Sequence, residues 1–191
     1  MSSMNHLRLV SMRPKPQSES LNRRVQPPSL EAFQREFDYI IRTLRRLGVS
    51  PNDVEDLAHE VFLVLFQSWD KYDASRPVRA YIFGIAFRVA GNHIRKRKRE
   101  ILFAVTDTTD SGPPPDQRLD TSQVRKIVLS ALERVPMERR AVLIMHDIDK
   151  LPMAEIASNL SIFLFTGYSR LRKARKEFAA AMTSLLGDSA S

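Results

Sequence analysis

The sequence predicts an all-α protein of two small helical domains joined by a flexible, proline-rich linker, the second being a helix-turn-helix domain. Apolar residues recur at spacings of three and four in each long segment, which is the period of an amphipathic helix. No segment alternates apolar and polar residues for long enough to form a strand. A stretch of Thr, Asp, Ser, Gly and Pro divides the 191 residues into two helical parts.

A flexible tail at 1–28 and a first domain at 29–100 are expected in the N-terminal part of the chain. The tail is rich in Ser, Pro and Arg and has no hydrophobic period. The first helix has Ser29 as a suitable N-cap and Gly48 as a suitable stop.

The next two helices of this domain also have recognisable starts. Ser50 is a suitable N-cap, Pro51 fits the first helical position, and Asp53 can complete a capping box. A loop that contains Trp69 follows, and Pro77 then opens a long helix that ends in a basic run.

The linker is expected at 101–121, the second domain at 122–183 and a short tail at 184–191. The Pro and Asp residues of the linker are typical of an extended connection. Beyond it, Pro136 and Pro152 each fit the first turn of a helix. The second domain is therefore predicted to have several short helices and a final basic one.

Composition limits the possible functions. The chain has 30 Lys and Arg against 22 Asp and Glu, and this net charge of +8 favours a polyanionic partner such as nucleic acid. The absence of cysteine excludes disulfides and a thiolate nucleophile. No apolar stretch reaches the roughly 20 residues that cross a bilayer, and no secretory signal is recognisable. We therefore expect a cytoplasmic protein without membrane insertion.

Basic residues gather in two separate clusters, which indicates two contacts with nucleic acid. The first comprises Arg88 and residues 95–99, and the second lies at 170–176. Residues 153–176 combine a short apolar helix, a corner and a basic helix, which is the plan of a helix-turn-helix whose second helix enters the major groove. An ordinary helical hairpin with a solvated basic face is the alternative.

The acidic side chains after Pro51 have three interpretations. Asp53, Asp56 and Glu60 have the spacing of one helix face, as a carboxylate metal site requires, but no second acidic helix supplies further ligands. Acids in a first turn also stabilise a helix through its dipole. A helix with acids on one side and apolar residues on the other can instead dock a partner.

Aromatic residues gather before the first basic cluster. They are Trp69, Tyr72, Tyr81, Phe83 and Phe87. Rings beside a cationic stripe can stack unpaired bases, and core packing is the alternative. Phe83 and Phe87 lie off the apolar stripe of their helix, so the packing of that stripe does not explain them.

Four stretches, taken in order, resemble the extracytoplasmic-function (ECF) class of bacterial sigma factors. They are DVEDLAHEVF at 53–62, VRAYIFGIA at 78–86 leading into IRKRKR at 94–99, MAEIA at 153–157 and YSRLRKAR at 168–175. The resemblance extends over roughly residues 30–180. It implies a cofactor-free, non-enzymatic subunit that joins core RNA polymerase, recognises the −35 element of promoter DNA and melts the −10 element.

The resemblance also assigns roles to residues. A coiled coil of the polymerase beta-prime subunit would be bound by Asp53, Asp56, Leu57, Glu60 and Val61. The −10 element would be bound by Tyr72, Arg79, Tyr81, Phe83, Arg88, Asn92, Arg95, Lys96 and Arg97. The −35 element would be bound by Thr166, Tyr168, Ser169, Arg170, Arg172, Lys173 and Arg175. The beta flap of the polymerase and an anti-sigma factor complete the expected partners.

The chain departs from the family pattern at the corner of the helix-turn-helix. Phe163 and Gly167 stand where the family has a helix-starting Pro and a buried Val, and Phe165 replaces a small residue. Glycine in a helix costs about 1 kcal/mol, and the missing Val removes burial worth roughly 1.5–3 kcal/mol. We therefore expect a less stable second domain with a weakened −35 contact, which reversion of the three positions would strengthen.

Two other functions remain open at this point. A stand-alone helix-turn-helix transcriptional regulator would need neither the acidic helix nor the aromatic-to-basic helix. A metal-dependent nuclease would use Asp53, Asp56 and Glu60, but it would need a second acidic cluster. The four histidines are scattered and no catalytic motif is present, so no enzymatic activity and no metal are expected.

Overall fold

The computed structural model describes residues 30–103 and 121–188, where the regular elements are helices, as the sequence predicts. In chain order these are α1 (Leu30–Arg46), α2 (Val54–Gln67), the 3-10 turn η1 (Trp69–Lys71), α3 (Val78–Phe103), α4 (Thr121–Glu133), α5 (Met137–Leu143), the π-helical turn η2 (Ile144–Ile148), α6 (Met153–Asn159) and α7 (Leu164–Asp188). Within the described ranges, no helix has both the length and the hydropathy that a membrane span requires.

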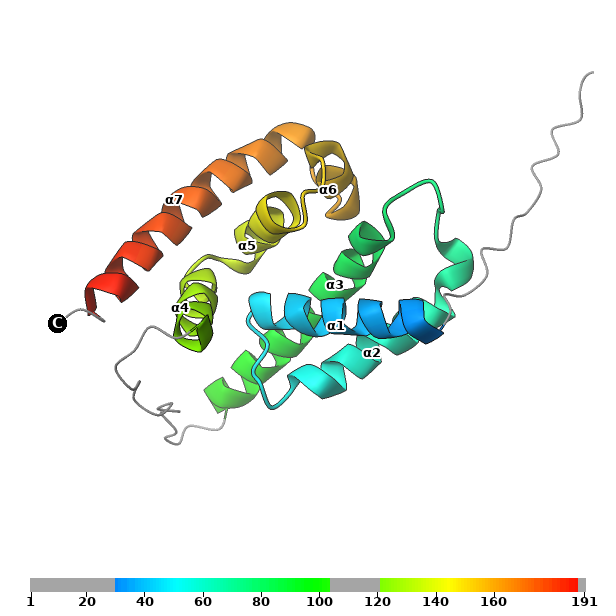
Figure 1. The fold of residues 1–191 in the computed structure, drawn as a ribbon, viewed down its shortest axis with the longest axis horizontal. Coiled ribbons are helices and arrows are strands. Elements are labelled where there is room, and N and C mark those ends of the chain that lie inside the picture. The colour runs from blue at the N-terminus through cyan, green and yellow to red at the C-terminus, as the bar shows by residue number, and fades with distance from the viewer. Residues whose placement is uncertain (1–29, 104–120, 189–191) are drawn as a thin grey trace, which may run out of the picture.

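Helices α1, α2 and α3 form the first half of the structure. Each of the three packs against the other two, and in Figure 1 α1 lies across α3 with α2 beneath it. Apolar side chains at the predicted helical spacing meet at the centre. The most buried of them include Ile40, Leu44, Val61, Ile82 and Ile85.

Helix α7 organises the second half. It runs alongside α4, α5 and α6, so that three short helices share one long support (Figure 1). Leu171 and Ala174 on its inner face join Leu132, Ile144 and Ile156 in the core. Burying one continuous apolar stripe on α7 therefore holds together three helices that are individually too short to be stable.

The two halves are packed against each other, and their buried side chains form one hydrophobic cluster. Helix α3 contacts α6, and α1 contacts α4. The contact with α6 is close because Gly84 has no side chain: a Cβ there would collide with Asn159. The Asn159 amide also donates a hydrogen bond to the carbonyl of Ala80.

A buried guanidinium connects the two halves. Arg140 donates to the carbonyls of Leu47 at 2.6 Å, Glu133 at 2.7 Å and Val135 at 3.1 Å, and only Leu47 belongs to the first half. Burial lowers the pKa of Arg140. The neighbouring Gly48 has a φ of 92°, and a Cβ there would lie 2.5 Å from Arg140 Nη1. Glycine at this position therefore permits both the turn and the approach of the guanidinium.

Two further polar contacts cross the same boundary. Tyr39 donates to a carboxylate oxygen of Asp149 at 2.6 Å, and burial raises the pKa of both groups. Arg76 donates to Glu155 from two nitrogens at 2.9 and 3.0 Å. The boundary thus combines apolar packing with directional hydrogen bonds, which fix the relative position of the halves.

Three expected boundaries need correction. Helix α2 begins at Val54 rather than after Ser50, because the intervening residues form a turn. The linker expected at 101–121 is too long at both ends, since α3 continues to Phe103 and α4 begins at Thr121; residues 104–120 and the tail at 1–28 lie outside the described residues. The tail expected at 184–191 is wrong for its first five residues, because α7 continues to Asp188.

Replacing Arg140 by Ala should destabilise the protein much more than replacing its neighbour Arg139. Arg140→Ala leaves three buried carbonyls without their charged donor, so the loss should be at least about 3 kcal/mol. Arg139 forms a half-exposed ion pair with Glu177, so Arg139→Ala should cost less than about 1 kcal/mol. Urea unfolding followed by circular dichroism measures both. Equal losses would show that the buried guanidinium does not hold the halves together.

Candidate binding surfaces

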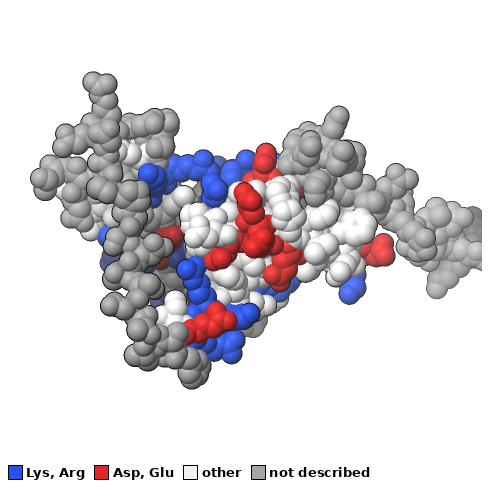
Figure 2. Space-filling view, turned by 90° about the horizontal axis from the view of Figure 1, so that it is seen from below, with Lys and Arg blue, Asp and Glu red and all other residues white. Residues whose placement is uncertain are grey.

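Helix α2 presents a face of acidic and apolar side chains to solvent. We define the α2 face as Asp56, Glu60, Leu63, Val64 and Phe66, all of which are exposed. Figure 2, a view from below Figure 1, shows acidic side chains gathered in the middle of the surface among uncharged ones. Phe66 is 62% exposed and Leu63 57%, which is unusual for large apolar residues. Such a face is typical of a protein-docking surface.

Of the predicted docking residues, Asp56 and Glu60 belong to the α2 face, whereas Leu57 and Val61 do not. Val61 is fully buried and Leu57 is 7% exposed, so both belong to the core rather than to a docking surface. Leu63, Val64 and Phe66 were missed. They lie off the stripe Val54, Leu57, Val61 and Leu65, and that offset was the available signal, although Phe62 shares it and is half-buried.

Asp53, which is also a predicted docking residue, makes contacts within the protein. Its carboxylate accepts hydrogen bonds from Ser50 Oγ at 2.8 Å, His93 Nε2 at 3.1 Å and Arg97 Nη1 at 3.0 Å. These contacts, first of all the one from Ser50, lower the pKa of Asp53. Asp53 therefore anchors the start of α2 to the basic part of α3. In the part of the chain that the structure describes, no group of three or more His, Asp and Glu residues could hold a metal ion.

Tyr72 and Tyr81 lie together at the start of α3. Their ring centroids are 5.4 Å apart, and Trp69 lies 5.1 Å from Tyr72. Tyr81 donates to Ser68, and Tyr72 donates to the carbonyl of Arg76 at 2.7 Å. Burial raises the pKa of Tyr72. The two tyrosines are thus held in place by hydrogen bonds that their own loop supplies.

A small pocket of about 120 Å³ lies beside these tyrosines. Its lining comprises Lys71, Tyr72, Asp73, Arg76, Pro77, Ala80, Tyr81 and Asn159. Asn159 comes from α6, so the second half of the protein forms part of the wall. The aromatic and hydrogen-bonding groups of this pocket are those that a base taken out of its stack would use.

The expectation that Phe83 contacts DNA is wrong for this arrangement, because its side chain is fully buried. Phe87 is half-buried and packs against the same core. Helix α3 has α1 and α2 on one side and α6 on another, so a position off its first apolar stripe is still covered. A helix that is packed on two sides buries more than one stripe.

The basic part of α3 is exposed. Arg79, Arg88, Asn92, Arg95, Lys96 and Arg97, all predicted to contact DNA, have exposed side chains. Asn92 accepts a hydrogen bond from Arg95 at 2.8 Å, and Arg97 is paired with Asp53. The Arg79 guanidinium lies 5.3 Å from the centre of the Tyr39 ring. The remaining cations, Lys98 and Arg99, also face solvent, so this segment presents a positively charged surface.

Helices α6 and α7 form the predicted helix-turn-helix. The chain turns at Ser161, whose φ is 52°, and the amide of Ile162 donates to the carbonyl of Ala157 at 2.9 Å. Gly167 lies on the buried face of α7, where an added Cβ would lie 2.6 Å from Met153 Sδ. The glycine therefore allows α7 to approach α6 closely.

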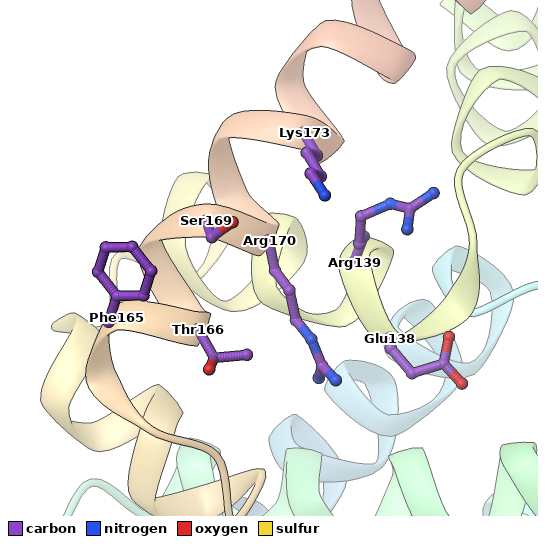
Figure 3. A pocket seen from close by; sticks show the side chains of 7 residues that line it. All are labelled: Glu138, Arg139, Phe165, Thr166, Ser169, Arg170 and Lys173. Atoms are coloured by element: carbon purple, nitrogen blue, oxygen red, sulfur yellow. The ribbon is translucent and has the colours of Figure 1, made fainter.

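A concave surface lies between α5 and the first turns of α7 (Figure 3). Its volume is about 540 Å³, and its lining comprises Glu138, Arg139, Phe165, Thr166, Ser169, Arg170 and Lys173. Arg139 is paired with Glu177, whereas neither Arg170 nor Lys173 forms an ion pair with another described residue. Thr166, Ser169, Arg170 and Lys173 were predicted as DNA-contacting residues, and the structure brings them together.

The other three residues predicted for this contact lie on α7 but do not line the concave surface. Tyr168 is 55% exposed and Arg172 is exposed. Arg175 donates two hydrogen bonds to Asp147, at 2.6 and 2.8 Å. These hydrogen bonds are the main reason that the pKa of Asp147 falls to about 2. At neutral pH the guanidinium of Arg175 is therefore engaged within the protein.

Comparison with known families matches residues 32–100 to Sigma-70 region 2 and residues 125–178 to Sigma-70, region 4. The ECF RNA polymerase sigma factor SigE of Mycolicibacterium smegmatis is 27% identical over 151 residues, which cover 77% of this chain and 58% of SigE. The RNA polymerase sigma factor CnrH of Cupriavidus metallidurans is 24% identical, over 75% of this chain and 80% of CnrH. The chain thus spans less than two thirds of the length of SigE.

Two solved structures share the fold. The sigma factor RpoE of Bartonella quintana, in complex with the anti-sigma factor NepR, aligns with a TM-score of 0.62 and 19% identity over 81% of this chain and 98% of that one. CnrH in complex with the cytosolic domain of CnrY aligns with a TM-score of 0.57 and 21% identity, over 82% and 90%. The helical architecture described above is therefore a known one.

Gly167→Val should lower the stability of the second half, contrary to the expectation from the sequence. The substitution gains only part of the roughly 1 kcal/mol by which glycine disfavours a helix. It places a branched side chain against Met153, and such overpacking costs about 1–3 kcal/mol. Differential scanning calorimetry should therefore show a lower melting temperature. A higher one would mean that Met153 moves aside at little cost.

Proposed function

Because the chain belongs to the ECF class of the sigma-70 family, we propose that it binds core RNA polymerase and directs it to promoters by recognising −35 DNA and melting −10 DNA. The observation that carries this proposal is the combination, in one chain, of an exposed acidic and apolar face with two exposed basic helices. The first suits a protein partner and the others suit DNA. The polymerase would carry out RNA synthesis itself, and the protein would have no enzymatic activity of its own. Both would act in the cytoplasm.

The α2 face is the proposed contact with the coiled coil of the beta-prime subunit. Its acids can steer and orient a basic partner, and Leu63 and Phe66 can supply the apolar centre that gives affinity. The contact would lie on the side of α2 opposite the core. Binding there would therefore need no change in the packing of α1 and α3.

The first half would also act on the −10 element. The Tyr72 and Tyr81 pocket suits a base that has left the stack, and the exposed cations of α3 suit the phosphates beside it. Flipping a base costs a few kcal/mol, so a preformed pocket next to a cationic helix lowers the barrier to opening the duplex. Asn92, exposed on the same helix, is placed to contribute to base preference.

The second half would place α7 in the major groove of the −35 element. Thr166, Ser169, Arg170 and Lys173 lie on the concave surface at the start of this helix, which is where recognition helices contact base edges. The beta flap of the polymerase is the proposed protein partner of this half. We add an anti-sigma factor to the proposed partners, because the RpoE structure above is a sigma factor bound to the anti-sigma factor NepR.

A stand-alone helix-turn-helix regulator explains less of the molecule. Such a protein needs the α6 and α7 pair, but it has no use for the α2 face or for a pocket beside Tyr72 and Tyr81. The two functions differ in a measurable way, because a regulator binds its duplex site without polymerase.

Glu60→Arg combined with Phe66→Ala should weaken binding to core polymerase at least tenfold while leaving the melting temperature nearly unchanged. Both side chains are exposed, and central aromatic residues often dominate the energy of an interface. Fluorescence anisotropy with labelled full-length protein measures the affinity. Glu100→Arg, an exposed acid on α3, is the matched control and should bind normally. An unchanged affinity in the double variant would remove the α2 face from the interface.

Replacing Arg95, Lys96, Lys98 and Arg99 by Ala should weaken promoter binding by the holoenzyme and flatten its salt dependence. Each lost phosphate contact lowers the slope of log affinity against log salt by about 0.9, so four should lower it by up to about 3–4. Arg97 is left in place because it holds Asp53. Mobility shifts at several salt concentrations measure the slope.

The control for this experiment is the pair Arg125→Ala and Lys126→Ala, two exposed cations on α4. This variant should keep the wild-type slope. If the slope of log affinity against log salt fell by the same amount in both variants, the effect would come from net charge. The basic part of α3 would then have no special role.

A further inference from the structure

Two phenylalanines at the start of α7 are almost fully exposed. Phe163 is 85% and Phe165 is 84% exposed, the highest values among the large apolar side chains of the described residues. Neither ring fills a space in the helix-turn-helix core, where Ile162 packs instead. Large apolar groups that face water in this way commonly mark a binding surface.

The register of α7 distinguishes the two rings. Gly167, Leu171 and Ala174 form its buried face. Phe165, Ser169 and Arg172 recur at spacings of four and three, so they form a line on the opposite side of the helix, on which Phe165 and Arg172 are exposed and Ser169 is half-buried. Phe163 precedes the first helical residue and does not share this line.

The surroundings of Phe165 indicate a duplex rather than another protein. The next three turns of α7 carry Arg170, Arg172, Lys173 and Lys176, besides Arg175, which is paired with Asp147. In Figure 3 Phe165 lies at one edge of the concave surface, and Arg170 and Lys173 lie along the same helix between it and Arg139. A cationic surface that holds phosphates would bring the ring at the leading end of the helix to the base edges.

The chemistry of the major groove then restricts the base. Thymine carries a 5-methyl group there, which is the apolar feature that a phenylalanine side chain contacts. Ser169 and Arg172, next along the same line, can hydrogen-bond to neighbouring base edges. We propose that Phe165 is a specificity-determining residue that packs against the methyl group of a thymine in the −35 element. The inference rests on the proposed function and names the base that this surface reads.

The test uses holoenzyme reconstituted from the full chain and core polymerase. Promoter fragments are first selected by this holoenzyme from a pool randomised in the −35 region. Each thymine there is then replaced by deoxyuridine, which removes only the methyl group, and the affinity is measured. At one position the wild type should lose about fourfold, which corresponds to about 0.8 kcal/mol for one methyl-sized group.

Variants assign this loss to one side chain. Phe165→Ala should bind the thymine promoter about as weakly as the wild type binds the deoxyuridine promoter, and it should no longer distinguish the two. Phe165→Leu, which keeps an apolar group, should still distinguish them. Phe163→Ala is the matched control, because it removes an equally exposed ring, and it should keep the full fourfold difference.

Several results would overturn the proposal. They are an undiminished deoxyuridine effect in Phe165→Ala, a lost effect in Phe163→Ala, and a wild type that tolerates deoxyuridine at every position. A Phe165→Ala variant that assembles poorly with core polymerase but keeps its base preference would assign the ring to a protein partner. If the holoenzyme selects no −35 sequence, the proposed function itself fails, which is a distinguishable result.

Discussion

Removing the Arg140 guanidinium from water is favourable only because three backbone carbonyls replace its hydration. Two of these carbonyls belong to the second half, and the third is that of Leu47, directly after α1. The charge therefore has its full set of partners only when the halves are together. Gly48, with its positive φ and no side chain, leaves room for this guanidinium beside the carbonyl of Leu47, so one glycine and one arginine together make a central contact between the halves.

Helical periodicity predicted most of the fold, because the stripe that each helix buries is a property of its own sequence. It could not predict that the halves share one core, since that depends on surfaces far apart in the chain. This is the reason that Phe83 was misassigned. A pattern confined to α3 shows one buried stripe, but α6 covers another where Gly84 and Ala80 leave room for it.

For the candidate surfaces too, the type of a residue predicted some features, whereas others depended on how distant parts of the chain pack. Charged residues were placed correctly as exposed, because burying them costs too much without partners. Apolar residues on α2 were harder, since Val61 and Phe66 have similar chemistry and differ only in helical phase. At the corner of the helix-turn-helix, the unusual residues predicted a less stable domain with a weakened −35 contact. The structure instead shows Gly167 in a tight contact and both phenylalanines available to a partner.

The pocket beside Tyr72 and Tyr81 has a wall that comes from Asn159 of the other half. An occupant that needs the space taken by Asn159 binds only in molecules whose halves have moved apart. The apparent affinity of the pocket is then its intrinsic affinity multiplied by the open fraction of the population. Any partner that holds the halves apart raises that fraction, and it thereby strengthens binding at a site that it does not touch.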